Sequence, residues 1–223
     1  MRPILVAALA IGLSLAATAL PAADRTILCV TDEHVGAYLD TVPKAFGTIL
    51  ARRGVKLGVN DKKGQTVADL HGSFEREVLK KKPTTLVLGL GVNDLWDFRK
   101  KQAVAEANER ATLALLADMV RQAKEAGIAV TLVTPPTPPV DAAEQAVVTA
   151  YAAALIDLAR EHGATVLDFA RPTTADGAYD KKGRLSPAIT EDLVLRAARS
   201  LGVSPESLPA LAVEDRVVFF SDA

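Results

Sequence analysis

The sequence has few of the residues that crosslink a chain, give it a strong charge or fill its core with rings. Cys29 is the only cysteine among 223 residues, so no internal disulfide can form. Aromatic residues make up 4% of the chain, which predicts an aliphatic core. The net charge is −1, with 26 basic against 27 acidic residues, and this argues against a nucleic-acid partner. The only imidazoles available for catalysis are those of His34, His71 and His162.

The long hydrophobic run is confined to the start of the chain. Residues 1–23 contain Arg2, an apolar stretch over residues 4–20 and then Pro21-Ala22-Ala23, a pattern typical of an export signal. We therefore expect residues 1–23 to be removed and the mature protein to be periplasmic or extracellular, with no stable membrane span. The remaining residues 24–223 are enough for one domain, with a core over about residues 26–201 and a tail over 203–223.

Short apolar runs alternate with longer helical patterns along the mature chain. Strands are predicted at residues 26–30, 55–59, 84–90, 128–133 and 165–169, and helices at about 37–53, 66–79, 103–126, 141–162 and 187–201. Gly127 and Gly163 are expected to end two of these helices, and Ser186 is expected to cap the last one. Alternating strands and helices predict an α/β fold, a doubly wound sheet of about five parallel strands with helices on both faces.

Ligands of such sheets bind beyond the carboxyl ends of the strands, so the loops that follow the strands are the candidate site. These loops contain Thr31-Asp32-Glu33-His34 after the first strand, Gly64-Gln65-Thr66 after the second and Gly91-Val92-Asn93-Asp94 after the third. The loop after the fifth strand contains Asp176-Gly177-Ala178-Tyr179.

These loops resemble the successive blocks of the SGNH, or GDSL, hydrolase superfamily. The segment from Gly91 to Asp94 is similar to its Gly-x-Asn-Asp block, and residues 64–70 are similar to its Gly-x-Thr-x-x-Asp-Leu block. The resemblance implies a flavodoxin-like sheet and ester hydrolysis through a serine acyl-enzyme. It also implies that Gly64 and Asn93 help to hold the developing oxyanion.

The nucleophile position and the base position both depart from the pattern that this family shares. The family has Gly-Asp-Ser where this chain has Thr31-Asp32-Glu33, and Asp-x-x-His where this chain ends in Tyr179 after a matching Asp176. A serine mechanism needs a hydroxyl to attack and an imidazole to take its proton. We therefore predict a pseudoenzyme that keeps the site positions Glu33, Gly64, Asn93, Asp176 and Tyr179 without ordinary serine esterase activity, and that binds a small-molecule or glycan ester ligand.

The acidic loops leave an alternative open. Glu33, Asp32 and Asp176, with or without His34, could form a rebuilt hydrolase site, and the carboxylates could also hold Ca²⁺ or Mg²⁺. The simpler interpretation has Asp32 and Asp94 capping helices or binding loop amides while Glu33 is solvated, and it requires neither metal nor cofactor. Cys29 is expected to be a buried hydrophobe.

Overall fold

The computed structural model describes residues 25–36, 55–97, 102–103, 106–137, 142–174, 177–179 and 185–200. The predicted signal, the helix predicted over residues 37–53, Asp176 and the tail all lie outside these residues. Within them, five parallel strands form one sheet in the order β2-β1-β3-β6-β7. The strands are β1 (Thr26–Thr31), β2 (Lys56–Asp61), β3 (Thr85–Gly89), β6 (Ala129–Thr134) and β7 (Thr165–Asp168).

This strand order is that of a flavodoxin-like doubly wound sheet, in which the chain passes from the interior strand β1 to the edge strand β2 and then returns to β3 and moves outward to the other edge. The fold predicted from the sequence is therefore confirmed. Each predicted strand is present, with its boundaries moved by one or two residues at most.

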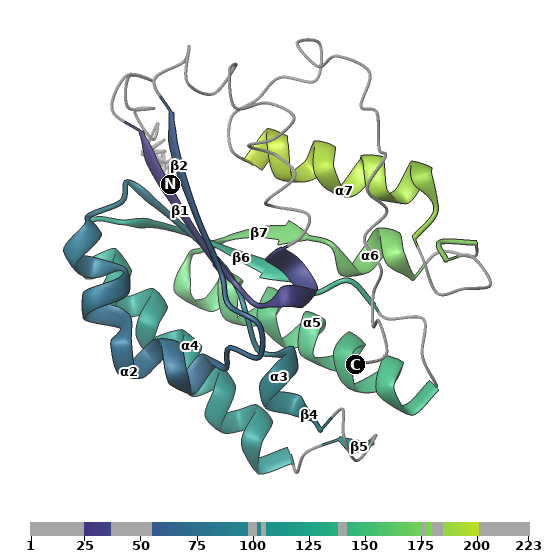
Figure 1. The fold of residues 1–223 in the computed structure, drawn as a ribbon. Helices are drawn as coiled ribbons and strands as arrows, with labels where there is room; N and C mark the ends of the chain where they lie inside the picture. Colours follow the sequence, from purple (N-terminus) through teal and green to yellow (C-terminus); the bar gives the residue numbers. More distant parts are fainter. Residues whose placement is uncertain are drawn as a thin grey trace, which may run out of the picture.

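Helices cover both faces of the sheet. Figure 1 shows α2, α4 and α5 below the sheet and α7 above it. These helices are α2 (Val67–Glu77), α4 (Glu106–Glu125), α5 (Ala142–His162) and α7 (Pro187–Ser200), and shorter elements are η2 (Leu79–Lys81), α3 (Val92–Leu95), α6 (Ala170–Thr173) and the antiparallel pair β4 (Trp96–Asp97) and β5 (Gln102–Ala103). The short elements were not predicted, because stretches of two to four residues carry no measurable periodicity.

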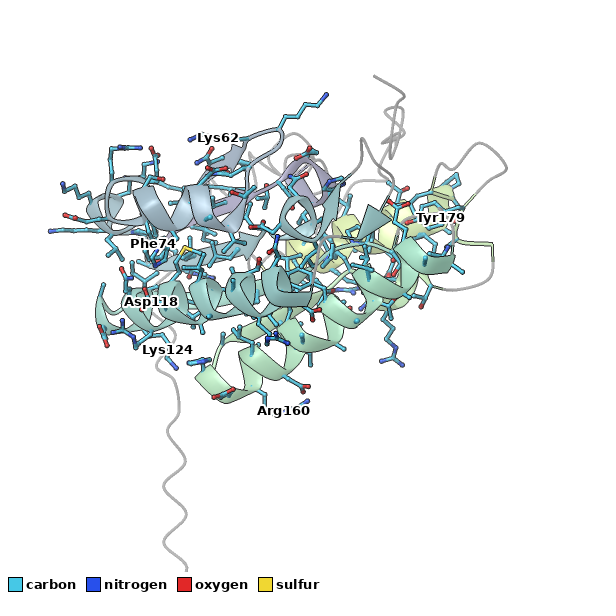
Figure 2. All side chains as sticks on the ribbon, turned by 90° about the horizontal axis from the view of Figure 1, so that it is seen from below. Lys62, Phe74, Asp118, Lys124, Arg160 and Tyr179 are labelled. Carbon is cyan, nitrogen blue, oxygen red and sulfur yellow. The ribbon has the colours of Figure 1, made fainter. Side chains whose placement is uncertain are left out.

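Alternate residues of β1 pack into two separate hydrophobic layers. Ile27 and Cys29 pack with α7, whereas Leu28 and Val30 pack with α2, α4 and α5. Cys29 is fully buried, and burial raises the pKa of its thiol to about 12, so it serves as the small hydrophobe that was predicted. Both layers are aliphatic apart from a few rings such as Phe74, which lies between α2 and α4 in Figure 2.

The predicted helix ends also hold. Gly127 follows α4 with a φ of +76° and Gly163 follows α5 with a φ of +61°, conformations that favour glycine. The Ser186 hydroxyl accepts a hydrogen bond from the Ile189 N–H, as a cap of α7 does. Helix α5 is long and apolar enough to cross a membrane, but it packs against α4, β6 and β7 as a core helix.

Candidate functional site

The candidate site lies at the carboxyl edge of the sheet, where the strand order changes direction. Strands β1 and β3 are neighbours here, although the chain runs from β1 to the outer strand β2 before it returns to β3. Such a switch point separates the loops of two adjacent strands and leaves room for a ligand. Glu33 follows β1, Gly64 follows β2 and Asn93 follows β3, so the topology brings the three residues together.

The Glu33 side chain reaches across this switch point and binds both other residues. Its Oε2 accepts a hydrogen bond of 2.9 Å from the Gly64 backbone N–H and one of 3.1 Å from Asn93 Nδ2. We call these two donors, the Gly64 N–H and the Asn93 side-chain amide, the cradle. A single carboxylate oxygen therefore accepts from both donors of the cradle.

The charge on Glu33 is stabilised by these donors. Burial of the carboxyl raises its pKa, but hydrogen bonds from its own backbone N–H, the Gly64 N–H and the Asn93 amide lower it, as does the nearby His34. The pKa of Glu33 is lowered overall, so the side chain is ionised at neutral pH and is a weak base. The expectation of a merely solvated Glu33 is wrong, because two loops supply donors at hydrogen-bond distance.

Gly64 lies in the loop directly before α2. It adopts a φ of +71°, which a residue without a Cβ reaches without strain, and the chain then enters the helix at Thr66. The Thr66 hydroxyl accepts from the Asp69 N–H at 3.1 Å, and the Asp69 carboxylate accepts from the Thr66 N–H at 3.2 Å. This reciprocal capping box pairs Thr66 with Asp69 within the first turn of α2.

Asn93 is positioned by the tight turn between β3 and α3. Gly91 has a φ of +122°, and a Cβ on it would lie 1.9 Å from the hydroxyl oxygen of Tyr151. Tyr151 is fully buried on α5 and donates to the Leu90 carbonyl at 2.7 Å. The sequence did not reveal this role of Tyr151, because nothing in an apolar helix pattern shows that one ring lies against a glycine 60 residues earlier.

Asp32 supports the loop from beneath. It has no exposed surface, and its Oδ1 accepts from the His34 N–H at 3.0 Å. Burial, followed by the charge of Glu33, raises its pKa to about 8, so it holds its proton at neutral pH. A carboxyl without exposed surface does not reach a substrate. Asp32 therefore cannot serve in the alternative hydrolase site that was built on Glu33, Asp32 and Asp176.

His34 is also buried, with 8% of its surface exposed. Burial lowers the pKa of its imidazole, while the charge of Glu33 and a hydrogen bond with the Asn93 side chain raise it, and the overall shift is downward. The ring is therefore neutral at pH 7 and lies against the cradle.

Tyr179, which the sequence motif predicts in the position of the family histidine, makes its contacts with residues outside the cradle. Its hydroxyl donates to the Thr137 carbonyl, its backbone pairs with Leu185, and its ring packs on the layer beneath α7. Burial raises the pKa of its phenol above the usual value, which makes it a still weaker acid and removes any role as a base near neutral pH. Figure 2 shows Tyr179 at the opposite end of the molecule from Lys124. Asp176 lies outside the described residues.

The remaining candidates have local roles. His71 binds Asp118 of α4 at 2.9 Å, and the Ser73 hydroxyl donates to the Asp69 carbonyl within its own helix. The carboxylate of Asp94 accepts from the Val67 N–H at the start of α2, which agrees with the capping role expected for it. In the parts of the chain that the structure describes, no three His, Cys, Asp or Glu side chains are grouped as a metal site would require.

The comparison with protein families agrees with this geometry. The model of the GDSL-like lipase/acylhydrolase family matches residues 29–189, well over half of the chain. The chain belongs to this family. No curated protein sequence matches it.

Solved structures share the fold at low sequence identity. An α/β hydrolase enzyme from the metagenome of Lake Arreo, Spain, has a TM-score of 0.66 and 17% identity, over 81% of this chain and 96% of that one. An acetylxylan esterase from Geobacillus stearothermophilus has a TM-score of 0.65 and 17% identity, over 82% and 96%. The acetyl xylan esterase AlAXEase has a TM-score of 0.66 and 16% identity, over 78% and 98%.

In the Geobacillus enzyme, alanine replacements of a serine, a histidine and an aspartate are described as catalytic mutants. At these identities the likeness shows the SGNH hydrolase fold of this family member and nothing of its substrate.

Proposed function

We propose that this GDSL-like family member binds an acylated or glycan-like ligand without hydrolysing it through a serine acyl-enzyme. One observation carries the proposal, namely that Glu33 Oε2 accepts hydrogen bonds from both cradle donors. An ester carbonyl needs these donors as its oxygen becomes negative, and a resident carboxylate both fills the position and repels the new charge.

The groups around the cradle support the same conclusion. Glu33 offers no hydroxyl, and its lowered pKa makes it a poor base. The phenol of Tyr179 is bound to the Thr137 carbonyl, and its raised pKa suits neither acid nor base catalysis at neutral pH. A serine-type hydrolase needs a nucleophile, a base and open oxyanion donors, and each of these three is altered here.

The ligand class is argued from the family and from the fold neighbours. Two of the neighbours are acetylxylan esterases, whose substrates are acetylated glycans, and the switch point of the sheet is retained. The proposal also places the mature protein outside the cytoplasm, because residues 1–23 have the composition of an export signal.

The experiment pairs binding with turnover on the same material. Purified mature protein is titrated calorimetrically with an acetylated xylo-oligosaccharide and with its deacetylated form, and acetate release is then measured in the same solutions. We expect heat of binding with the acetylated form and no release of acetate above that from buffer.

Two results would contradict the proposal in different ways. Acetate release by the wild type that disappears in Glu33→Ala would show an active, carboxylate-dependent hydrolase. Absence of both binding and release would show that acetylated glycans are the wrong ligand class.

A further inference from the structure

Asp94 joins the two loops that supply the cradle donors. It lies on α3 directly after Asn93, and its carboxylate reaches the first turn of α2. The Val67 N–H lies 2.9 Å from its Oδ2 and 3.2 Å from its Oδ1. Burial raises the pKa of this carboxyl overall, and hydrogen bonds from the Val67 and Ala68 N–H groups only partly offset that rise.

Two different side chains accept hydrogen bonds from the backbone N–H groups in the first turn of α2. A helix leaves its first N–H groups without partners inside the helix. Here the Asp69 N–H goes to the Thr66 hydroxyl of the same loop, whereas the Val67 N–H goes to Asp94 of a different loop. Thr66 therefore caps the helix locally, and Asp94 fastens the helix to α3.

This tie connects the two loops that carry the cradle donors. Gly64 lies three residues before Val67, and Asn93 lies next to Asp94. The hydrogen bond between Asp94 and Val67 therefore joins the two segments that carry the cradle donors, close to both donors. A second hydrogen bond joins the same two segments: Asn93 Nδ2 donates to the Gln65 carbonyl at 3.2 Å. Glu33 Oε2 lies between the two donors.

We propose that Asp94 is a positioning residue, which holds the Gly64 N–H and the Asn93 amide at the spacing that lets one oxygen atom accept from both. It acts through the backbone of α2 and α3 and does not touch the bound oxygen. The inference rests on the geometry of the cradle and stands independently of the ligand in the proposed function.

The test follows the ionisation of Glu33 through its two donors. In the ¹⁵N-labelled mature protein, the resonances of the Gly64 N–H and the Asn93 side-chain amide are recorded against pH. Asp94→Ala is expected to raise the midpoint of this titration by about half a pH unit or more, because Glu33 loses part of a hydrogen bond to its charged form.

Thr66→Ala is the matched control. It removes a cap from the same helix end and is expected to lower Tm to a similar extent, while the tie between Asp94 and Val67 remains. The Glu33 midpoint should therefore stay at the wild-type value. Asp94→Asn keeps one oxygen acceptor and should give a midpoint between those of the wild type and Asp94→Ala.

The groups that titrate nearby are Asp32 and His34 beside Glu33, Asp94 itself, whose pKa is raised by burial, and Asp69 beside Asp94. Resonances of residues 32, 34, 69 and 94 therefore identify their own transitions. If Asp94→Ala does not fold, a midpoint in Asp94→Asn that exceeds the one in Thr66→Ala supports the proposal. Equal midpoints in the Asp94 and Thr66 variants would overturn it, since Asp94 would then be only a helix cap. Ester hydrolysis is not a readout here, so this proposal and the proposed function fail separately.

Discussion

The double substitution Glu33→Ser/Tyr179→His is expected to hydrolyse short acyl-nitrophenyl esters at least about 100-fold faster than the wild type or either single variant. Serine at position 33 removes the carboxylate from the cradle and supplies a hydroxyl nucleophile. Histidine at position 179 supplies a group whose pKa suits proton transfer at neutral pH. Initial rates measured by nitrophenolate release at pH 7 to 8 check the prediction.

The single variants separate these contributions. Glu33→Ser has an open cradle and a hydroxyl but no imidazole base, whereas Tyr179→His has an imidazole but a filled cradle and no hydroxyl. Adding Asn93→Ala to the double variant should lower its rate about 10²- to 10³-fold, because one oxyanion donor is lost. A double variant that is no faster than the single variants would show that the Gly64 N–H and the Asn93 amide do not stabilise an oxyanion. A wild type as fast as the double variant would refute the assignment of Glu33 as a blocking group.

Gly91→Ala is expected to cost about 3 kcal/mol of unfolding free energy or more, because one added methyl group would combine a steric clash with a strained backbone. The new Cβ would lie 1.9 Å from the Tyr151 hydroxyl oxygen and 2.4 Å from its ring carbon Cζ, at a φ of +122°. Tyr151 is fully buried and its hydroxyl is bonded to the Leu90 carbonyl, so the ring cannot withdraw without breaking that bond. Urea denaturation followed by circular dichroism measures the loss.

Gly127→Ala is the control for backbone strain alone. Gly127 has a φ of +76°, and a Cβ there would have no neighbour within 4 Å. Its substitution should therefore cost only about 1 to 2 kcal/mol. Equal losses of unfolding free energy at positions 91 and 127 would mean that the clash with Tyr151 contributes nothing. That result would contradict the packing described above.

The sequence predicts the sheet well because its signals are local and redundant. Strand β3 has an unbroken apolar run, and Gly127 and Gly163 each follow a long periodic segment, so element type and helix ends follow from neighbouring residues. The same locality places Gly64 and Asn93 in loops after strands. The parallel order of the strands then brings those loops to one edge.

The contacts that define the site depend on residues far apart in the chain. Glu33 is 31 residues from Gly64 and 60 from Asn93, and its rotamer follows from the donors it meets rather than from its own segment. The sequence therefore shows glutamate where the family has its serine and predicts the loss of serine catalysis, but the expectation that Glu33 lies in solvent was wrong. Tyr179 was assigned by its place in a motif, whereas its hydroxyl is committed to the Thr137 carbonyl.

The central claim is that the carboxylate of Glu33 is the occupant of the cradle, and the pH titration of the cradle N–H groups tests it most directly. The prediction is that the Gly64 N–H and the Asn93 side-chain amide of the wild type titrate together with a midpoint below the usual glutamate value of 4.5, because both donors favour the ionised form. Above that midpoint Glu33 is charged and the bonds are intact; below it they weaken. In Glu33→Gln, which keeps the size of the side chain without the charge, this shared transition should vanish. A wild-type midpoint at or above 4.5, or a transition that persists in Glu33→Gln, would contradict the account.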